Sequence, residues 1–92
     1  MCRNITELRG LEPPATTEEI EAAAWQYVRK VTGVTHPSGA IADDMRAVAG
    51  HVAVLTEELL DRLPSRRQPP KTVPPLRRPE VRRRLGLEPF AG

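Results

Sequence analysis

The chain has 92 residues, a length that allows one domain, and its net charge is +2. It contains one Cys, one Trp, one Tyr and one Phe. The single Cys excludes a disulfide-stapled scaffold, and the lack of a signal peptide or of a span of ~20 apolar residues predicts a soluble, cytoplasmic protein with no membrane contact. A domain this small buries only about 60% of its unfolded surface, so we expect a partner chain to supplement its core.

Residues 1–15 have no sustained periodicity. Three apolar side chains, Ile5, Leu8 and Leu11, recur every third residue. The pair Pro13-Pro14 prevents any longer helix. We therefore predict an N-terminal arm that places these three side chains on the helices that follow.

A helix is predicted from Thr16 or Thr17 to just before Gly33. Thr16 and Glu19 have the spacing of a capping box, and Gly33 suits the left-handed residue that ends a helix. Between them an apolar stripe follows the helical period. Its members are Ile20, Ala23, Ala24, Tyr27, Val28 and Val31.

A second helix is predicted to begin between Ser38 and Asp43, after a Pro/Gly turn, and to end at Pro64. Its apolar residues are spaced alternately by four and three, as in the a/d seam of a heptad repeat. The seam consists of Ile41, Met45, Val48, Val52, Leu55 and Leu59, and Ala42, Ala49, Thr56 and Leu60 widen one side of it.

The composition changes at Pro64. Residues 64–92 hold seven of the ten prolines and carry a net charge of +6, whereas residues 1–63 carry −4. The prolines predict a largely extended tail, apart from two possible helical turns between Pro79 and Gly86. The predicted fold is therefore all-α. Residues 1–63 form a domain made of the arm and an antiparallel two-helix hairpin, and residues 64–92 form a basic, Pro/Arg-rich tail.

Four motifs together resemble one family of small bacterial proteins, domain of unknown function family 2277. They are Met1-Cys2-Arg3-Asn4-Ile5, Glu12-Pro13-Pro14-Ala15-Thr16, Gln26-Tyr27-Val28-Arg29-Lys30-Val31 and Pro37-Ser38. The resemblance covers roughly residues 1–63. It implies a bacterial, cytoplasmic, helical protein and no assigned activity. Where the family usually has an aromatic residue and a lysine in the turn, this chain has Val34 and His36.

Cys2 is the candidate nucleophile, although we assign no catalytic residue. Removal of Met1 would leave an N-terminal cysteine, whose amine could act as the base for its own thiol. The simpler interpretation is a free thiol on the arm. Neither His36 nor His51 has metal-ligand spacing with Cys2 or with the other His, so we predict no metal and no cofactor. The lack of catalytic motifs counts against an enzyme.

The leading hypothesis for function is a self-associating interaction module that forms a four-helix homodimer or binds another protein, because the hairpin alone has too little core. Trp25 lies off the main stripe, where it could either widen the hydrophobic face or anchor an interface. The predicted interface residues are Trp25, Tyr27, Val31, Val48, Val52, Leu55 and Leu60.

Two alternatives remain open: an N-terminal cysteine enzyme or thiol sensor, and a nucleic-acid-associated accessory protein that uses its tail. Arginines of the tail could neutralise phosphates, but no aromatic residues alternate with them to stack on bases. The arginines could equally fold back on the acidic body or remain solvated. They are Arg66, Arg67, Arg77, Arg78, Arg82, Arg83 and Arg84.

Overall fold

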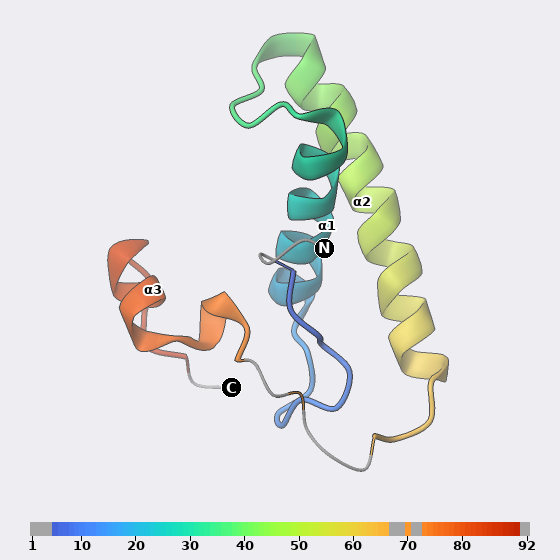
Figure 1. The fold of residues 1–92 in the computed structure, drawn as a ribbon, viewed down its shortest axis with the longest axis vertical. Coiled ribbons are helices and arrows are strands. Elements are labelled where there is room, and N and C mark those ends of the chain that lie inside the picture. Colours follow the sequence, from blue (N-terminus) through green and yellow to red (C-terminus); the bar gives the residue numbers. More distant parts are fainter. Residues whose placement is uncertain (1–4, 67–69, 71–72, 91–92) are drawn as a thin grey trace.

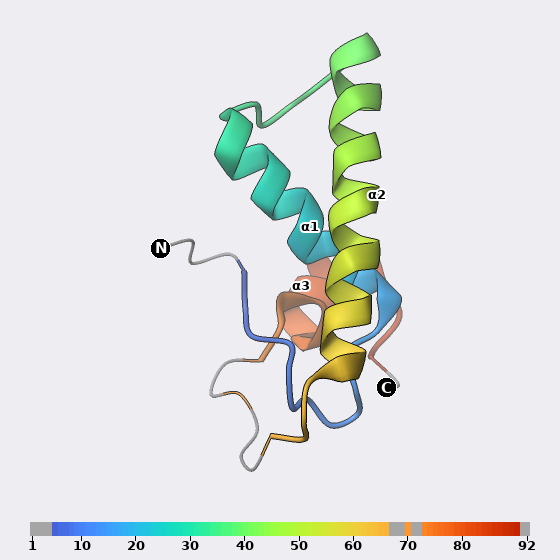
Figure 2. The same cartoon turned by 90° about the vertical axis from the view of Figure 1, so that its right-hand side faces the viewer.

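The computed structural model describes residues 5–66, 70 and 73–90, and within them the fold is all-α, as predicted. The elements in chain order are α1 (Thr17–Thr32), α2 (Gly39–Arg62), the short 3-10 helix η1 (Pro75–Arg77) and α3 (Pro79–Arg84). Helices α1 and α2 form an antiparallel pair, and α3 lies across α1 from α2 (Figure 1). From the side, the axes of α1 and α2 cross at an angle (Figure 2).

The boundaries of the hairpin follow the local signals. At the start of α1, the Thr16 backbone N–H donates to Glu19 Oε1 at 2.9 Å, and the Glu19 N–H donates to Thr16 Oγ1 at 3.2 Å. At its end, Gly33 adopts φ 73° and donates its N–H to the Arg29 carbonyl at 2.9 Å. Helix α2 begins at Gly39 and ends before Pro64. The predicted capping box, glycine stop and proline stop are thus confirmed.

The face of α2 that packs against α1 differs from the predicted seam. Four of the six seam residues, Ile41, Val48, Leu55 and Leu59, are 58%, 51%, 64% and 49% exposed, whereas Met45 is buried and Val52 packs against the core. The buried cluster consists of Ile20, Ala24 and Val28 of α1 with Met45, Ala49 and Ala53 of α2.

The small size of alanine explains this difference. The distance between packed helices depends on the side chains at the contact, so three buried alanines let the two backbones approach closely. Helix α2 is therefore turned so that Ala49 and Ala53 contact α1 together with Met45 of the seam, and four of the six seam residues face outward.

The N-terminal arm covers the open side of the hairpin. Leu8 and Ala15 pack against the buried cluster, and Ile5 lines a groove between the helices. Leu11 is half-buried beside Ile20 and the end of α2. The predicted packing of the arm on the helices is thus confirmed for Leu8, while Ile5 and Leu11 line pockets beside them.

The tail folds back on the hairpin and contains two short helices. Helix α3 starts with Pro79 at its first position, and Gly86 follows its end with φ 74°, where the sequence predicted two helical turns. Val81 of α3 is buried. Residues 64–92 thus contain helical as well as extended segments, within the described part of the chain.

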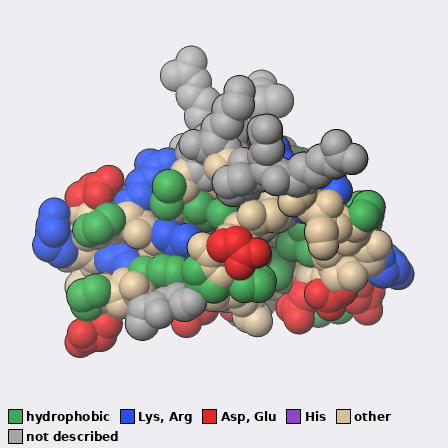
Figure 3. Space-filling view, turned by 90° about the horizontal axis from the view of Figure 1, so that it is seen from below, with side chains coloured by type: hydrophobic (Ala, Val, Ile, Leu, Met, Phe, Trp, Pro, Cys, Tyr) green, Lys and Arg blue, Asp and Glu red, His purple; other side chains and the backbone are tan. Residues whose placement is uncertain are grey.

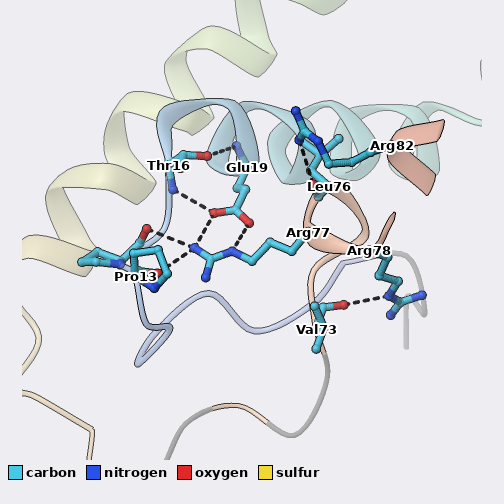
Figure 4. Close-up of polar contacts among 9 residues, drawn as sticks. Pro13, Thr16, Glu19, Val73, Leu76, Arg77, Arg78 and Arg82 are labelled. Atoms are coloured by element: carbon cyan, nitrogen blue, oxygen red, sulfur yellow. Dashed lines mark hydrogen bonds and ion pairs between the residues drawn. The ribbon is translucent and has the colours of Figure 1, made fainter. Parts of the chain in front are cut away.

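A buried ion pair holds the tail against the start of α1 (Figure 4). Arg77 Nε donates to Glu19 Oε2 at 2.7 Å, and Arg77 Nη2 donates to Glu19 Oε1 at 3.0 Å. The same Nη2 donates to the carbonyls of Pro13 and Pro14 at 2.7 and 3.1 Å. The two side chains are only 1% (Glu19) and 8% (Arg77) exposed. The arm, α1 and the tail therefore meet at a single polar cluster.

Glu19 is ionised in this cluster. Burial by itself would raise its pKa, but the hydrogen bond from Arg77, the bonds from Thr16 and the guanidinium charge outweigh burial and hold the pKa below its usual value. A carboxylate in the first turn of α1 is also favoured by the helix dipole.

The close contact of α1 and α2 can be tested with Ala49→Leu. We expect this substitution to lower the free energy of unfolding by about 1–3 kcal/mol, because a larger side chain at a buried alanine forces the helices apart. Ala47→Leu is the matched control at an exposed position of α2 and should change it by about 0.5 kcal/mol or less. Urea unfolding measures both, and equal effects would contradict the packing described here.

The ion pair can be tested with Glu19→Gln. At neutral pH we expect the free energy of unfolding to fall by about 1–3 kcal/mol, because Arg77 loses its charged partner. Since the folded-state pKa of Glu19 is lowered, its stabilisation is present above the unfolded-state pKa and is lost as pH falls through the folded-state pKa. The difference between wild type and variant should therefore shrink on acidification. Glu18→Gln, at the exposed neighbouring position, should show neither effect.

Candidate interaction surface

Large apolar side chains are exposed along both helices of the hairpin. Three of them on α2, Ile41, Val48 and Leu55, repeat every seven residues and so share one face of the helix. On α1, Tyr27 and Val31 are four residues apart and also share a face. We call the following set the exposed apolar face; its members are 48–67% exposed: Tyr27, Val31, Ile41, Val48, Leu55 and Leu59.

A groove joins the parts of this face that belong to the two helices. It has a volume of about 310 Å³, and Tyr27 of α1 and Val52 of α2 both line it. Val52 is one helical turn from both Val48 and Leu55, so the stripe on α2 continues into the groove. The arm closes one side of the groove with Ile5. The apolar residues of α1, α2 and the arm therefore form one connected surface.

One end of the molecule has a different character. At the end of the molecule shown in Figure 3, hydrophobic side chains are interspersed with acidic and basic ones. A surface of that kind is well hydrated, whereas adjoining exposed apolar side chains favour contact with another protein.

The seven predicted interface residues occupy three different environments. Four of them, Tyr27, Val31, Val48 and Leu55, belong to the exposed apolar face. Val52 is half-buried in the groove. The remaining two, Trp25 and Leu60, pack against the hairpin's own core.

Trp25 is additionally held by Arg46, whose Cζ lies 4.7 Å from the centroid of the ring. This packing fits the first of the two alternatives for Trp25, in which its side chain widens the hydrophobic face of α1. Sequence reasoning placed Ile41 and Leu59 in the seam but did not name them as interface residues. Their heptad spacing with Val48 and Leu55 was the signal that could have included them.

Most of the described tail arginines bind oxygens of this same chain. Arg66 pairs with Glu7, and Arg78 Nε donates to the Val73 carbonyl at 3.0 Å. Arg82 Nη1 donates to the Leu76 carbonyl at 2.8 Å, while Arg77 is buried against Glu19. Four of the seven candidate arginines thus have intramolecular acceptors.

Two other candidate arginines, Arg83 and Arg84, are exposed on α3. Arg67 lies outside the described residues. Two of the described arginines, Arg66 and Arg77, fold back on carboxylates of the body, whereas Arg78 and Arg82 bind carbonyls of the tail itself.

The other chemical candidates contribute little to this surface. Cys2 lies outside the described residues, so its surroundings are not part of the geometry. His36 is in the turn, where its Nδ1 is 3.2 Å from Thr35 Oγ1, and His51 is exposed on α2. Across residues 5–66, 70 and 73–90, no three potential metal ligands come together. No helix in this same part of the chain is long and apolar enough to cross a membrane.

Comparison with known proteins identifies the family. The family described as "Uncharacterized conserved protein (DUF2277)" matches residues 1–84. This match extends beyond residue 63, where the resemblance was expected to end, and it includes η1 and α3. The chain has no significant match among curated proteins or among solved structures. Because the matched region covers most of its length, the chain belongs to the DUF2277 family of uncharacterized conserved proteins.

Proposed function

We propose that this protein is a small interaction module that self-associates through the exposed apolar face. The observation that carries the proposal is the row of apolar side chains that α2 leaves outside the hairpin core. Each protomer would contribute α1 and α2, and the pair would form a four-helix homodimer.

The spacing of the exposed residues supports a second copy as the partner. Ile41, Val48 and Leu55 at seven-residue intervals, with Leu59 one turn further, are spaced as knobs that fit between the same residues of another helix. In a two-fold dimer each copy presents the same patch, so one self-complementary stripe is sufficient.

The available surface also suits a dimer. A stable interface typically buries about 800 Å² per partner, which is about a ninth of the 7026 Å² accessible surface of the described residues. A helix of 24 residues is about 36 Å long, so two α2 helices packed side by side offer an interface of adequate length. The small buried cluster of the monomer gives the physical reason for association, since further apolar burial stabilises the fold.

The alternative functions remain predictions. An N-terminal cysteine enzyme or thiol sensor depends on Cys2, which is outside the described residues. Binding of nucleic acid would depend on tail arginines, four of which have acceptors within the chain. Neither alternative has an observation that favours it over self-association.

Self-association can be tested with Leu55→Glu. We expect the wild-type chain to sediment at twice its mass of 10.2 kDa and the variant to sediment as a monomer, because a carboxylate at the centre of the stripe would have to be buried without a partner. Val54→Glu is the matched control. Val54 is 58% exposed, but it lies roughly 120° around α2 from the stripe, so this variant should remain a dimer.

Circular dichroism should be measured alongside, to confirm that each variant keeps its helices. Wild-type protein that stays monomeric at high micromolar concentration would defeat the proposal. Equal dissociation of the Val54 and Leu55 variants would show that any charge on α2 disrupts the dimer, and it would rule out this face as the specific contact.

A further inference from the structure

A second concave site lies between the tail and the outer side of α1. This cleft has a volume of about 320 Å³. None of the six side chains of the exposed apolar face lines it, so it is distinct from the proposed dimer contact. Its apolar walls come from α1 and from the tail, and they include Ala22, Ala23, Trp25, Pro74, Leu76 and Val81.

Beside the cleft, polar contacts of η1 hold the tail against the start of α1. The Arg77 guanidinium fastens η1 to Glu19 and to the carbonyls of Pro13 and Pro14. Helix α3 packs against η1, and it carries Val81 and Arg84 to the far wall of the cleft. The tail therefore spans a gap over α1 that its own side chains leave open.

The charges around the cleft are unequal. Glu19 is the sole carboxylate among the lining residues, and its two oxygens already accept hydrogen bonds from Arg77 and from the Thr16 N–H. Arg84 also lines the cleft, and it is exposed on α3. With Glu19 neutralised by Arg77, the described lining of the cleft is mostly apolar, with the polar side chains of Thr6 and Gln26 and the cation of Arg84.

We propose that this cleft binds a compact, largely apolar small molecule that carries one negative charge. Its apolar part would lie against Trp25 and Val81, and its anionic group would pair with the Arg84 guanidinium. Ligand sites in proteins are typically about 300–1,000 Å³, lined by apolar and aromatic side chains with a few polar groups that fix orientation. The cleft is at the lower end of that range, which favours a ligand of one ring or a short chain.

Binding would also stabilise the docked tail. The ligand contacts both α1 and the tail, so it binds the docked arrangement in preference to any arrangement with the tail released. Saturation with ligand should therefore slow hydrogen exchange of the α3 backbone amides.

The experiment uses phenylpropionate as the probe and the full chain as the protein. Trp25 is the single Trp, so its indole N–H gives one resolved signal in a heteronuclear NMR spectrum of isotope-labelled protein. We expect a saturable shift of this signal. Phenylpropanol, which has the same ring and chain but no charge, should bind more weakly, because it cannot form the ion pair.

Two adjacent arginines supply the matched comparison. Arg84→Glu should weaken phenylpropionate binding about tenfold or more, whereas Arg83→Glu should leave it unchanged, because Arg83 is exposed on the same helix but does not line the cleft. As a second variant, Ala22→Leu should abolish binding of both probes by filling the cleft from α1, where Ala22 is exposed.

Several outcomes would overturn the proposal. One is a shift that rises linearly with probe concentration, which indicates non-specific contact. Another is equal weakening by Arg83→Glu and Arg84→Glu, which indicates a general effect of tail charge. Undiminished binding to the Ala22→Leu variant would place the probe elsewhere, including on the exposed apolar face.

Discussion

The buried ion pair of Glu19 and Arg77 is the constraint on which the arrangement of the whole chain depends. Glu19 has two roles in it: its carboxylate closes the capping box that starts α1, and it receives the guanidinium that anchors the tail. Arg77 also satisfies the carbonyls of Pro13 and Pro14, which end the arm. A buried ion pair contributes little net stability compared with apolar packing, but leaving either partner alone is costly. The pair therefore selects one position of the tail over others.

The hairpin shows how a small protein can divide its apolar residues between two uses. Alanines fill the contact of α1 with α2, so the two helices approach closely with little side-chain volume between them. The larger side chains of α2, including Val48 and Leu55, are then left at the surface. In the proposed homodimer, a second copy would cover these side chains and add to the buried apolar area. The same packing that stabilises the hairpin thus prepares the surface on which the proposed self-association depends.

Part of the opposite charge of the body and the tail is paired within the molecule. An acidic body and a basic tail could have indicated a nucleic-acid partner, since phosphates attract clustered arginines. In the structure, Arg66 and Arg77 pair with carboxylates of the arm and α1, and Arg78 and Arg82 bind backbone carbonyls. The match of the family through residue 84 includes this folded-back segment. The described part of the tail packs against the hairpin and, together with α1, lines the cleft beside Trp25.

The sequence by itself determined α1, the end of α2 and the position of α3, but it left the start of α2 between Ser38 and Asp43 and did not predict η1. The residues that start or end these helices act on the backbone next to them, so their effect can be predicted from the sequence alone. They are Thr16 with Glu19, Gly33, Pro64 and Pro79. Only the tertiary structure decided which face of α2 would be buried. Its apolar stripe is wider than one contact requires, and periodicity alone does not distinguish its alanine side from its Val/Leu side. Only the tertiary structure also decided that Arg77 would find Glu19, because two residues so far apart in the chain meet through the path of the folded backbone, which no local spacing encodes.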